Sequence, residues 1–240
     1  MKPGVRAVFF DFAGTLFSDR DLRDAHLRQL RRVAELAGAD VDDAALRAAY
    51  RHGMGIAYRD IAGRSWYTHR ALFGAAFTAM AAHLGAQLSS ATVQELVDQQ
   101  YLATIEHAVP RPDCLATLQA LRDRKLQVHV VSNIDDEQLL PMLDRMQLAP
   151  LLDRWTSSDE AKSCKPDSRI FRYALGKAGV PAQRVLFVGD SVGHDVAGPS
   201  AVGMRTALLT ANAKPAYGTV EPDYVIDTLN DVLAVIDAAG

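Results

Sequence analysis

The sequence predicts an α/β protein, in which a doubly wound parallel sheet carries a helical bundle inserted after its first strand. Four consecutive apolar residues, Ala7–Phe10, fit a strand that is buried on both faces. Residues 18–107 then show only helical periodicity, and from Asp113 onward helices alternate with short apolar strands. Such alternation is typical of a parallel sheet with helices on both faces and right-handed crossovers.

The alternating part of the chain supplies the other elements of the predicted sheet. Strands are expected at 128–131, 155–157, 184–188, 206–209 and 224–226, of which the strand at 155–157 has the weakest pattern. Helices are expected at 115–124, 136–146, 170–178, 192–201 and 229–236.

The inserted segment is interpreted as four helices with short polar joins, which is typical of a compact helical bundle. Their expected starts are Ser18 with Asp21, Asp40 with Asp43, Trp66, and Ser89 or Ser90. The bundle ends before Pro110 and Pro112, because proline breaks a helix. We therefore expect a core domain of residues 1–17 and 108–240, and a helical domain of residues 18–107.

Composition and charge exclude several classes of protein. The formal net charge of -3 argues against a nucleic-acid-binding surface, which normally carries a basic patch. The apolar stretch 71–86 is shorter than the roughly 20 residues of a membrane-spanning helix, and the N-terminal apolar run is too short for a signal-peptide core. Cys114 and Cys164 cannot build a disulfide framework. We expect a cytoplasmic monomer or homodimer that binds neither nucleic acid nor membrane.

Polar residues follow the predicted strands at their carboxyl ends. They are Asp11, then Ser132 and Asn133, then Lys165, and finally Asp190, Ser191 and Asp195. In a doubly wound sheet these ends face one edge, where ligands bind. Carboxylates suit Mg²⁺ and a lysine neutralises an anion, so Asp11 is a candidate nucleophile towards phosphorus. A plain turn-capping role for Asp11 stays open at this point, because Asp and Gly are ordinary turn residues.

The order of these motifs resembles the haloacid dehalogenase superfamily, whose core is Rossmann-like and whose helical cap is inserted directly after the first motif. The resemblance covers almost the whole chain. It is carried by residues 11–16, by Ser132 with Asn133, by Lys165 with Pro166 and Asp167, and by Gly189, Asp190, Ser191 and Asp195. It implies that the first strand lies between the strands at 128–131 and 184–188, so that Asp11 and Asp190 sit on adjacent strand ends.

The resemblance also implies roles for individual residues. Asp11 would be the nucleophile, Ser132 and Lys165 would bind phosphate, and Thr15 and Asn133 would contact the substrate. Mg²⁺ would be held by Asp11, Asp190 and the backbone oxygen of Ala13, with Asp195 as a direct or indirect ligand. Lys162 is a poorer candidate than Lys165, because it lacks the following Pro-Asp pair.

One position departs from the family pattern. Phosphatases of the superfamily usually carry a second aspartate two residues after the nucleophile, as the general acid, and here that position is Ala13. General acid–base catalysis contributes ~10²–10⁴-fold, so its loss weakens phosphoryl transfer without excluding it, because the electrostatic contribution is usually larger. The cap offers His52, Arg59 and His69 as proton donors or substrate contacts. Taken singly, each is equally a polar residue on the outer face of a bundle.

Two relatives without that acid provide the alternatives. Haloacid dehalogenases need no metal and dispense with the acidic fourth motif, which this chain retains in Asp190 and Asp195. Phosphonoacetaldehyde hydrolase has alanine at the same position but relies on a cap lysine, and here that position is Tyr58, with no lysine between Lys2 and Lys125.

The expected function is therefore a Mg²⁺-dependent hydrolase, most simply a phosphoric monoester hydrolase. It would act on a small phosphorylated metabolite through an aspartyl-phosphate at Asp11. Cleavage of a C–P or C–halogen bond is the alternative reaction. A catalytically weakened sensor of a phosphate ligand is the alternative from another class. The cap surface would set the substrate, which the sequence does not name.

Overall fold

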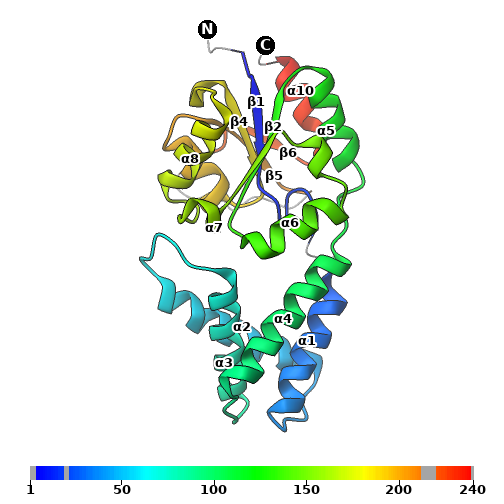
Figure 1. Cartoon of the computed structure of the whole chain (residues 1–240), viewed down its shortest axis with the longest axis vertical. Coiled ribbons are helices and arrows are strands. Elements are labelled where there is room, and N and C mark those ends of the chain that lie inside the picture. The colour runs from blue at the N-terminus through cyan, green and yellow to red at the C-terminus, as the bar shows by residue number, and fades with distance from the viewer. Residues whose placement is uncertain (1–3, 19–21, 212–219, 239–240) are drawn as a thin grey trace. The chain divides into compact units, whose positions relative to one another are not determined.

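A computed structural model gives the structure of the chain and describes residues 4–18, 22–211 and 220–238 (Figure 1). The chain divides into two compact units, one formed by Met1–Ser18 and Val109–Gly240 and the other by Asp19–Ala108. The first is an α/β unit built on one sheet, and the second is helical. Each is described by itself below.

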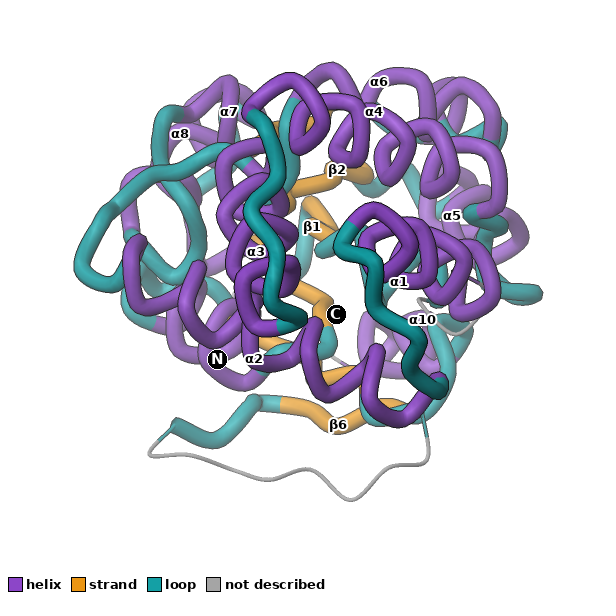
Figure 2. The backbone as a smooth tube through the Cα atoms, turned by 90° about the horizontal axis from the view of Figure 1, so that it is seen from below, coloured by secondary structure: helices purple, strands orange, loops and turns teal. Residues whose placement is uncertain are grey.

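The α/β unit is built on a six-stranded parallel sheet in the order β3-β2-β1-β4-β5-β6. The predicted place of the first strand, between the second and the fourth, is confirmed, since Phe9 pairs with His129 on one side and Phe187 on the other. Figure 2 shows β2 beside β1 and β6 at the far edge. The strands are β1 (Ala7–Phe10), β2 (Gln127–Ser132), β3 (Arg154–Ser157), β4 (Val185–Gly189), β5 (Arg205–Leu209) and β6 (Tyr224–Ile226).

Helices cover both faces of this sheet, as expected for a doubly wound fold. Helix α8 packs on the face that carries Phe9 and Phe187, through Ile170, Phe171 and Ala174. Figure 1 shows α5 and α10 on the opposite face from α8. The helices of the unit are α5 (Cys114–Asp123), α6 (Asp136–Arg145), α7 (Ser158–Ala161), α8 (Ser168–Ala178), α9 (Gly198–Ser200) and α10 (Asp231–Ala238), with short 3₁₀ turns at η2 (Ala149–Leu151) and η3 (Ala182–Arg184).

The segment after β4 differs from the single regular helix predicted over 192–201. It forms a π-helical turn, η4 (Val192–Ala197), followed by the short α9. Gly198 packs so closely on Phe171 that an added Cβ would lie 2.6 Å from the ring, and Pro199 has no N–H to donate. These two local constraints were not included in the periodicity argument, and π-turns occur frequently at functional sites.

The helical unit contains α1 (Arg23–Leu36), α2 (Asp43–Ile61), α3 (His69–His83) and α4 (Ser90–His107). Side-chain caps fix three of the starts: Asp42 accepts from Ala45 N, Thr68 from Ala71 N and Ser89 from Thr92 N. The predicted starts at Asp40 and Trp66 were therefore early by two residues or more. Asp21, part of the predicted first cap, lies outside the described residues, and the residue before α1 is Leu22.

The core of the helical unit consists of apolar residues contributed by all four helices. Buried members include Leu30, Leu46, Phe77, Met80 and Leu96.

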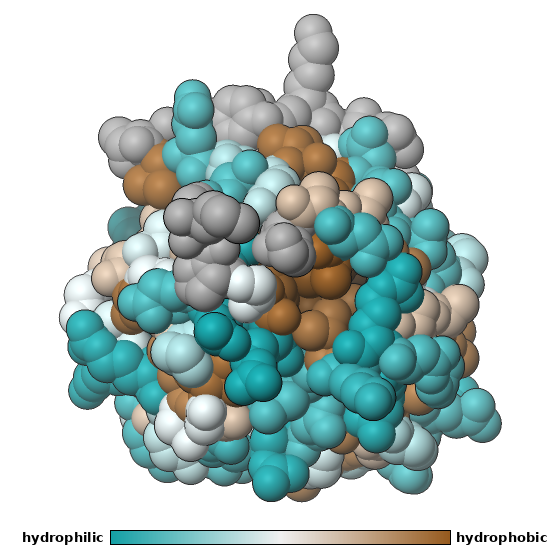
Figure 3. Space-filling view, turned by 90° about the horizontal axis from the view of Figure 1, so that it is seen from above, coloured by the Kyte–Doolittle hydropathy of each residue, from teal (hydrophilic) through white to brown (hydrophobic). Residues whose placement is uncertain are grey.

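No helix within the described part of the chain is long and apolar enough to span a bilayer. Figure 3 shows that the face seen from above is mostly hydrophilic around a central hydrophobic area.

Candidate active site

The loop after β1 places Asp11 at the carboxyl edge of the sheet. Asp11 N donates to Val188 O at 2.9 Å and so extends the ladder with β4 by one residue. The chain then turns tightly, with Phe12 O accepting from the backbone N–H of Thr15, Leu16 and Phe17. Gly14 makes this turn possible, because its φ of 82° lies in the left-handed region. Asp11 is held at the base of the loop with only 6% of its surface exposed.

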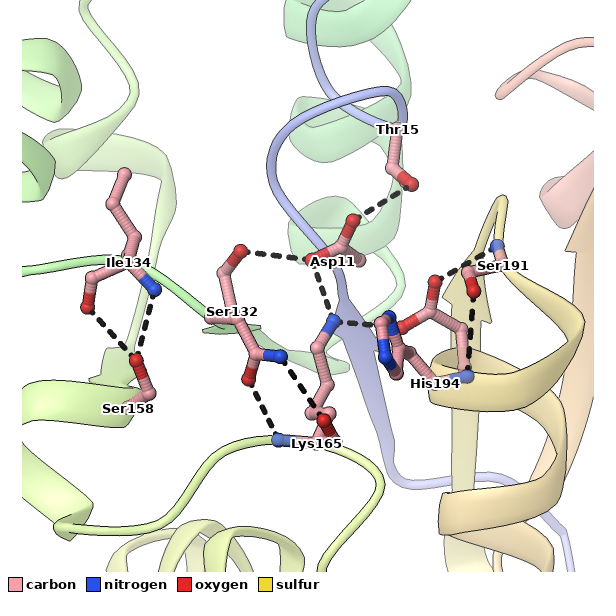
Figure 4. Close-up of polar contacts among 10 residues, drawn as sticks. Asp11, Thr15, Ser132, Ile134, Ser158, Lys165, Ser191 and His194 are labelled. Atoms are coloured by element: carbon pink, nitrogen blue, oxygen red, sulfur yellow. Dashed lines mark hydrogen bonds and ion pairs between the residues drawn. The ribbon is translucent and has the colours of Figure 1, made fainter. Parts of the chain in front are cut away.

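Three side chains from different segments converge on the Asp11 carboxylate (Figure 4). Ser132 Oγ donates to Oδ1 at 2.8 Å, and Lys165 Nζ donates to the same oxygen at 2.6 Å. Thr15 Oγ1 faces the other oxygen, Oδ2, at 3.5 Å. Among the described residues, Oδ2 therefore has one long contact, whereas two short contacts hold Oδ1.

Lys165 joins two buried carboxylates. Its Nζ lies 2.6 Å from Asp11 Oδ1 and 2.6 Å from Asp195 Oδ1. Burial alone would lower the pKa of Lys165, but the charges of Asp11 and Asp195 outweigh burial and raise this pKa. Burial raises the pKa of Asp195 to about 7, partly offset by Lys165 and reinforced by Asp11. The ammonium of Lys165 therefore stays protonated between the two carboxylates.

The backbone of Lys165 is fixed by Asn133. Asn133 Oδ1 accepts from Lys165 N at 2.6 Å, and Asn133 Nδ2 donates to Lys165 O at 3.0 Å. Ser158 Oγ in turn binds both the N–H and the C=O of Ile134, at 3.0 and 3.2 Å. These hydrogen bonds link the end of β2 to the loop that carries Lys165. They thereby hold Ser132 and Lys165 close to each other.

Three carboxylates form a potential cation site. One oxygen each of Asp11, Asp190 and Asp195 lies within 4.8 Å of the other two. All these donors are oxygens, the ligand type that Mg²⁺ prefers. Asp190 is the exposed member, and both oxygens of the buried Asp195 are already engaged, one by Lys165 Nζ and the other by Ser191 N at 3.0 Å. This donor set fits Mg²⁺, with Asp11 and Asp190 as the better direct ligands and Asp195 as the group that orients Lys165.

Gly14 also controls how closely Asp190 approaches the loop after β1. A Cβ at Gly14 would lie 2.2 Å from Asp190 Oδ2. A side chain at this position would therefore displace the carboxylate. The glycine thus serves both the turn and the packing of the acidic group.

Two further residues of this region, His194 and Arg111, were not expected from the sequence. His194, labelled in Figure 4 beside Ser191, donates its backbone N–H to Ser191 Oγ at 3.3 Å. Burial and the Lys165 charge lower the pKa of His194, and the Asp11 charge partly restores it. Arg111 binds the carbonyls of Gly14 and Thr15, in the loop after β1, from a segment far along the chain. His194 directly precedes Asp195, which was a usable signal, whereas nothing in the residues around Arg111 indicated its contacts.

The predicted cap contacts lie within the helical unit. His52 on α2 packs against His83 on α3 with ring centroids 4.4 Å apart. Arg59 is exposed in the last turn of α2, and His69 at the start of α3 contacts Tyr67 and Phe73. The roles of His52, Arg59 and His69 in substrate binding stay predictions.

Comparison with known proteins gives a consistent result. A sequence model of haloacid dehalogenase-like hydrolases matches residues 5–203. The chain is 26% identical over 238 residues to the "Ribulose-1,5-bisphosphate 5-phosphatase" of Halopiger xanaduensis, a match that covers 96% of this chain and 98% of the relative.

Solved structures share the fold. The magnesium-bound putative HAD-hydrolase YfnB from Bacillus subtilis aligns with a TM-score of 0.80 at 19% identity, covering 98% of this chain and 100% of that one. The L-2-haloacid dehalogenase of Xanthobacter autotrophicus, with chloropropionic acid covalently bound, aligns with a TM-score of 0.76 at 18% identity and the same coverage. At these identities the likeness is one of fold.

Proposed function

The chain belongs to the haloacid dehalogenase-like hydrolases, and from this premise we propose that it is a Mg²⁺-dependent phosphatase of small phosphorylated metabolites. The observation that carries the proposal is the group of three carboxylates formed by Asp11, Asp190 and Asp195. Hydrolysis at carbon does not need such a group, whereas phosphoryl transfer uses a cation to offset the charge of the phosphate. The relative from Halopiger xanaduensis, a phosphatase by name, supports the same reaction class.

The residues of the α/β unit divide the work of phosphoryl transfer. Asp11 attacks phosphorus through Oδ2, the oxygen with the single long contact, while Ser132 and Lys165 hold Oδ1. An ammonium has three N–H donors, and the contacts to Asp11 and Asp195 use two of them. The third donor of Lys165 serves a phosphoryl oxygen. The ester bond to the leaving group breaks as the bond to Asp11 forms, and the leaving group takes the electron pair. Water then attacks phosphorus, the bond to Asp11 breaks, and phosphate departs with both protons of the water while the carboxylate is regenerated.

The residues that would hold the metal are Asp11, Asp190 and the backbone carbonyl of Ala13. When bound, Mg²⁺ would supply positive charge against the phosphoryl oxygens and screen them from the Asp11 carboxylate. Asp195 orients Lys165 and the 189–191 turn through its two engaged oxygens. In this proposal Asp195 acts on the metal site indirectly, which is one of the two roles expected from the sequence.

The substrate preference follows from Ala13. Its methyl group cannot protonate a leaving oxygen, and the residue is exposed at the tip of the loop. The enzyme should therefore favour substrates whose leaving groups depart readily as anions, such as acyl or aryl phosphates, unless a cap histidine donates the proton.

Turnover of p-nitrophenyl phosphate tests the proposal, because its leaving group hardly needs an acid. We expect Mg²⁺-dependent phosphate release that excess chelator stops and that Asp190→Asn abolishes. A protein that binds phosphate without turnover would be a sensor instead. Full hydrolase activity in excess chelator, with release of halide from a 2-haloacid, would show a dehalogenase.

A further inference from the structure

Arg111 is bound to three successive carbonyls of the turn at residues 11–17, which follows β1 and begins with the proposed nucleophile. This turn is called the nucleophile loop below. Its Nε donates to Thr15 O at 2.8 Å, its Nη2 to Gly14 O at 2.5 Å, and its backbone N to Leu16 O at 2.9 Å. Beside it, Pro110 forms an antiparallel bridge with Phe17. One residue from a distant part of the chain thus binds three successive carbonyl acceptors of the turn.

These contacts act on the groups that do the proposed chemistry. The anchored residues include Thr15, whose hydroxyl faces Asp11 Oδ2, and Gly14, which packs against Asp190. Ala13, whose carbonyl is a proposed metal ligand, immediately precedes the anchored carbonyls. A turn through glycine has high conformational freedom, so an external anchor is what keeps such a loop in one geometry.

The planar guanidinium suits this task in a way that lysine does not. Its fixed fork presents two parallel N–H groups to two neighbouring carbonyls, whereas an ammonium is a point donor. Arg111 also lies at the start of the α/β unit's second segment, two residues after Val109. A residue close to the point where the chain re-enters the α/β unit therefore binds the loop from which the insertion departs.

We infer that Arg111 is a positioning residue for the proposed reaction, setting the geometry of residues 13–16 and, through them, the Mg²⁺ ligand at Ala13 and the hydroxyl of Thr15. The inference rests on the proposed function. Arg111 touches neither substrate nor reacting atoms, so it acts through the loop.

The test compares Arg111→Met, which keeps the length of the stem, with Arg111→Lys and with a matched control, Arg205→Met. Arg205 is a buried arginine that also donates to a backbone carbonyl, Gln183 O in η3 at 3.2 Å, but it lies at the amino end of β5, away from the site. Both methionine variants remove an arginine–carbonyl contact. Only the Arg111 variant should affect the site.

Three measurements decide the matter. By titration calorimetry, Arg111→Met should bind Mg²⁺ about 10–100-fold more weakly, as for loss of an outer partner of a metal ligand. With p-nitrophenyl phosphate, kcat should fall by about 10²-fold, the cost of misplaced reacting groups, with KM little changed. Arg111→Lys should recover part of both losses, and Arg205→Met should change neither. Amide hydrogen exchange in residues 12–17 should speed up in Arg111→Met alone.

Failure of the inference differs from failure of the proposed function. If Arg111→Met lowers the melting temperature but keeps the Mg²⁺ affinity and kcat of the wild type, Arg111 is merely structural and the inference is wrong. If the wild type itself binds no Mg²⁺ and releases no phosphate, the proposed function fails. Amide hydrogen exchange then tests, independently of catalysis, whether Arg111 fixes the nucleophile loop. Unchanged exchange in residues 12–17 of Arg111→Met would overturn that role, and faster exchange would support it.

Discussion

Gly14 combines a positive φ of 82° with a close approach to Asp190. The first feature concerns backbone strain and the second concerns the site. A matched pair of substitutions separates them, because Gly38 also has a positive φ, of 66°, but would place its Cβ in open space.

We predict that Gly14→Ala abolishes Mg²⁺-dependent phosphate release, because its Cβ would displace the Asp190 carboxylate. Gly38→Ala should cost stability of the same order, roughly 1 kcal/mol for the strained backbone, and leave activity intact. Steady-state assays and thermal melts of both variants provide the check. Equal activity in the two variants would show that the contact with Asp190 does not matter.

Ala13 provides the second residue-scale prediction. Ala13→Asp introduces a carboxyl group at the position of the missing general acid. Hydrolysis of alkyl phosphates should rise by some part of ~10²–10⁴-fold, and aryl or acyl phosphates should gain less, because their leaving groups need little protonation. Rates on both substrate classes give the comparison. No selective gain would mean that leaving-group protonation does not limit the enzyme, or that a cap residue such as His52 or His69 already provides it.

At the scale of elements, β2 carries an ionisable group in the centre of the sheet. His129 is 2% exposed and stacks on Phe9 with centroids 4.7 Å apart. Burial lowers its pKa to about 4, against an opposing effect of Asp153. The imidazole is therefore neutral in the folded protein, whereas in the unfolded chain it titrates at its ordinary value of 6.5.

The sign of the pH effect follows from this difference. Between pH 6.5 and about 4 the unfolded state binds the extra proton, so stability falls as the pH falls, by up to roughly 3 kcal/mol. His129→Leu should remove this contribution, leaving the smaller ones of His26 and His194, whose pKa values are also lowered, and the opposite one of Asp195, whose pKa is raised. Denaturant unfolding at pH 7 and pH 5 tests the prediction. The same loss of stability in both proteins would contradict it.

The elements also show what sequence patterns can and cannot predict. Buried strands such as β1 and β4 were found from unbroken apolar runs, which few other structures produce. The break between η4 and α9 was not found, because it depends on how closely Gly198 meets Phe171, a contact between residues far apart in the chain. The observed caps of α2 and α3 are Asp42 and Thr68, and the predicted starts lay two residues before them. Several neighbouring polar residues offered equivalent caps, so the sequence did not single out the right one.

The same distinction holds for the candidate site. Asp11, Ser132, Lys165, Asp190 and Asp195 were found because each follows a predicted strand, and parallel topology brings strand ends together. Arg111 was not found, because its contacts are to backbone carbonyls, which carry no sequence signal. The link between Asn133 and Lys165 was likewise visible only in the fold.

At the scale of the whole molecule, one α/β unit holds all the groups proposed for the chemistry, and the helical unit holds the candidates for substrate selection. The first part rests on described contacts around Asp11. The second part is a proposal that follows from Ala13: a site without its own proton donor depends on the substrate or on the cap. Both the proposed chemistry and the proposed substrate selection depend on Asp11 as the nucleophile.

Detection of the covalent intermediate is the direct test of Asp11 as the nucleophile. The protein is mixed with Mg²⁺ and an acyl or aryl phosphate, quenched in acid during turnover, and digested for mass spectrometry. The account predicts a peptide that contains Asp11 and has gained the mass of one phosphoryl group, in the wild type but not in Asp11→Asn or in excess chelator. Phosphate release by Asp11→Asn at the wild-type rate, or turnover with no phosphoryl group on the Asp11 peptide, would contradict it.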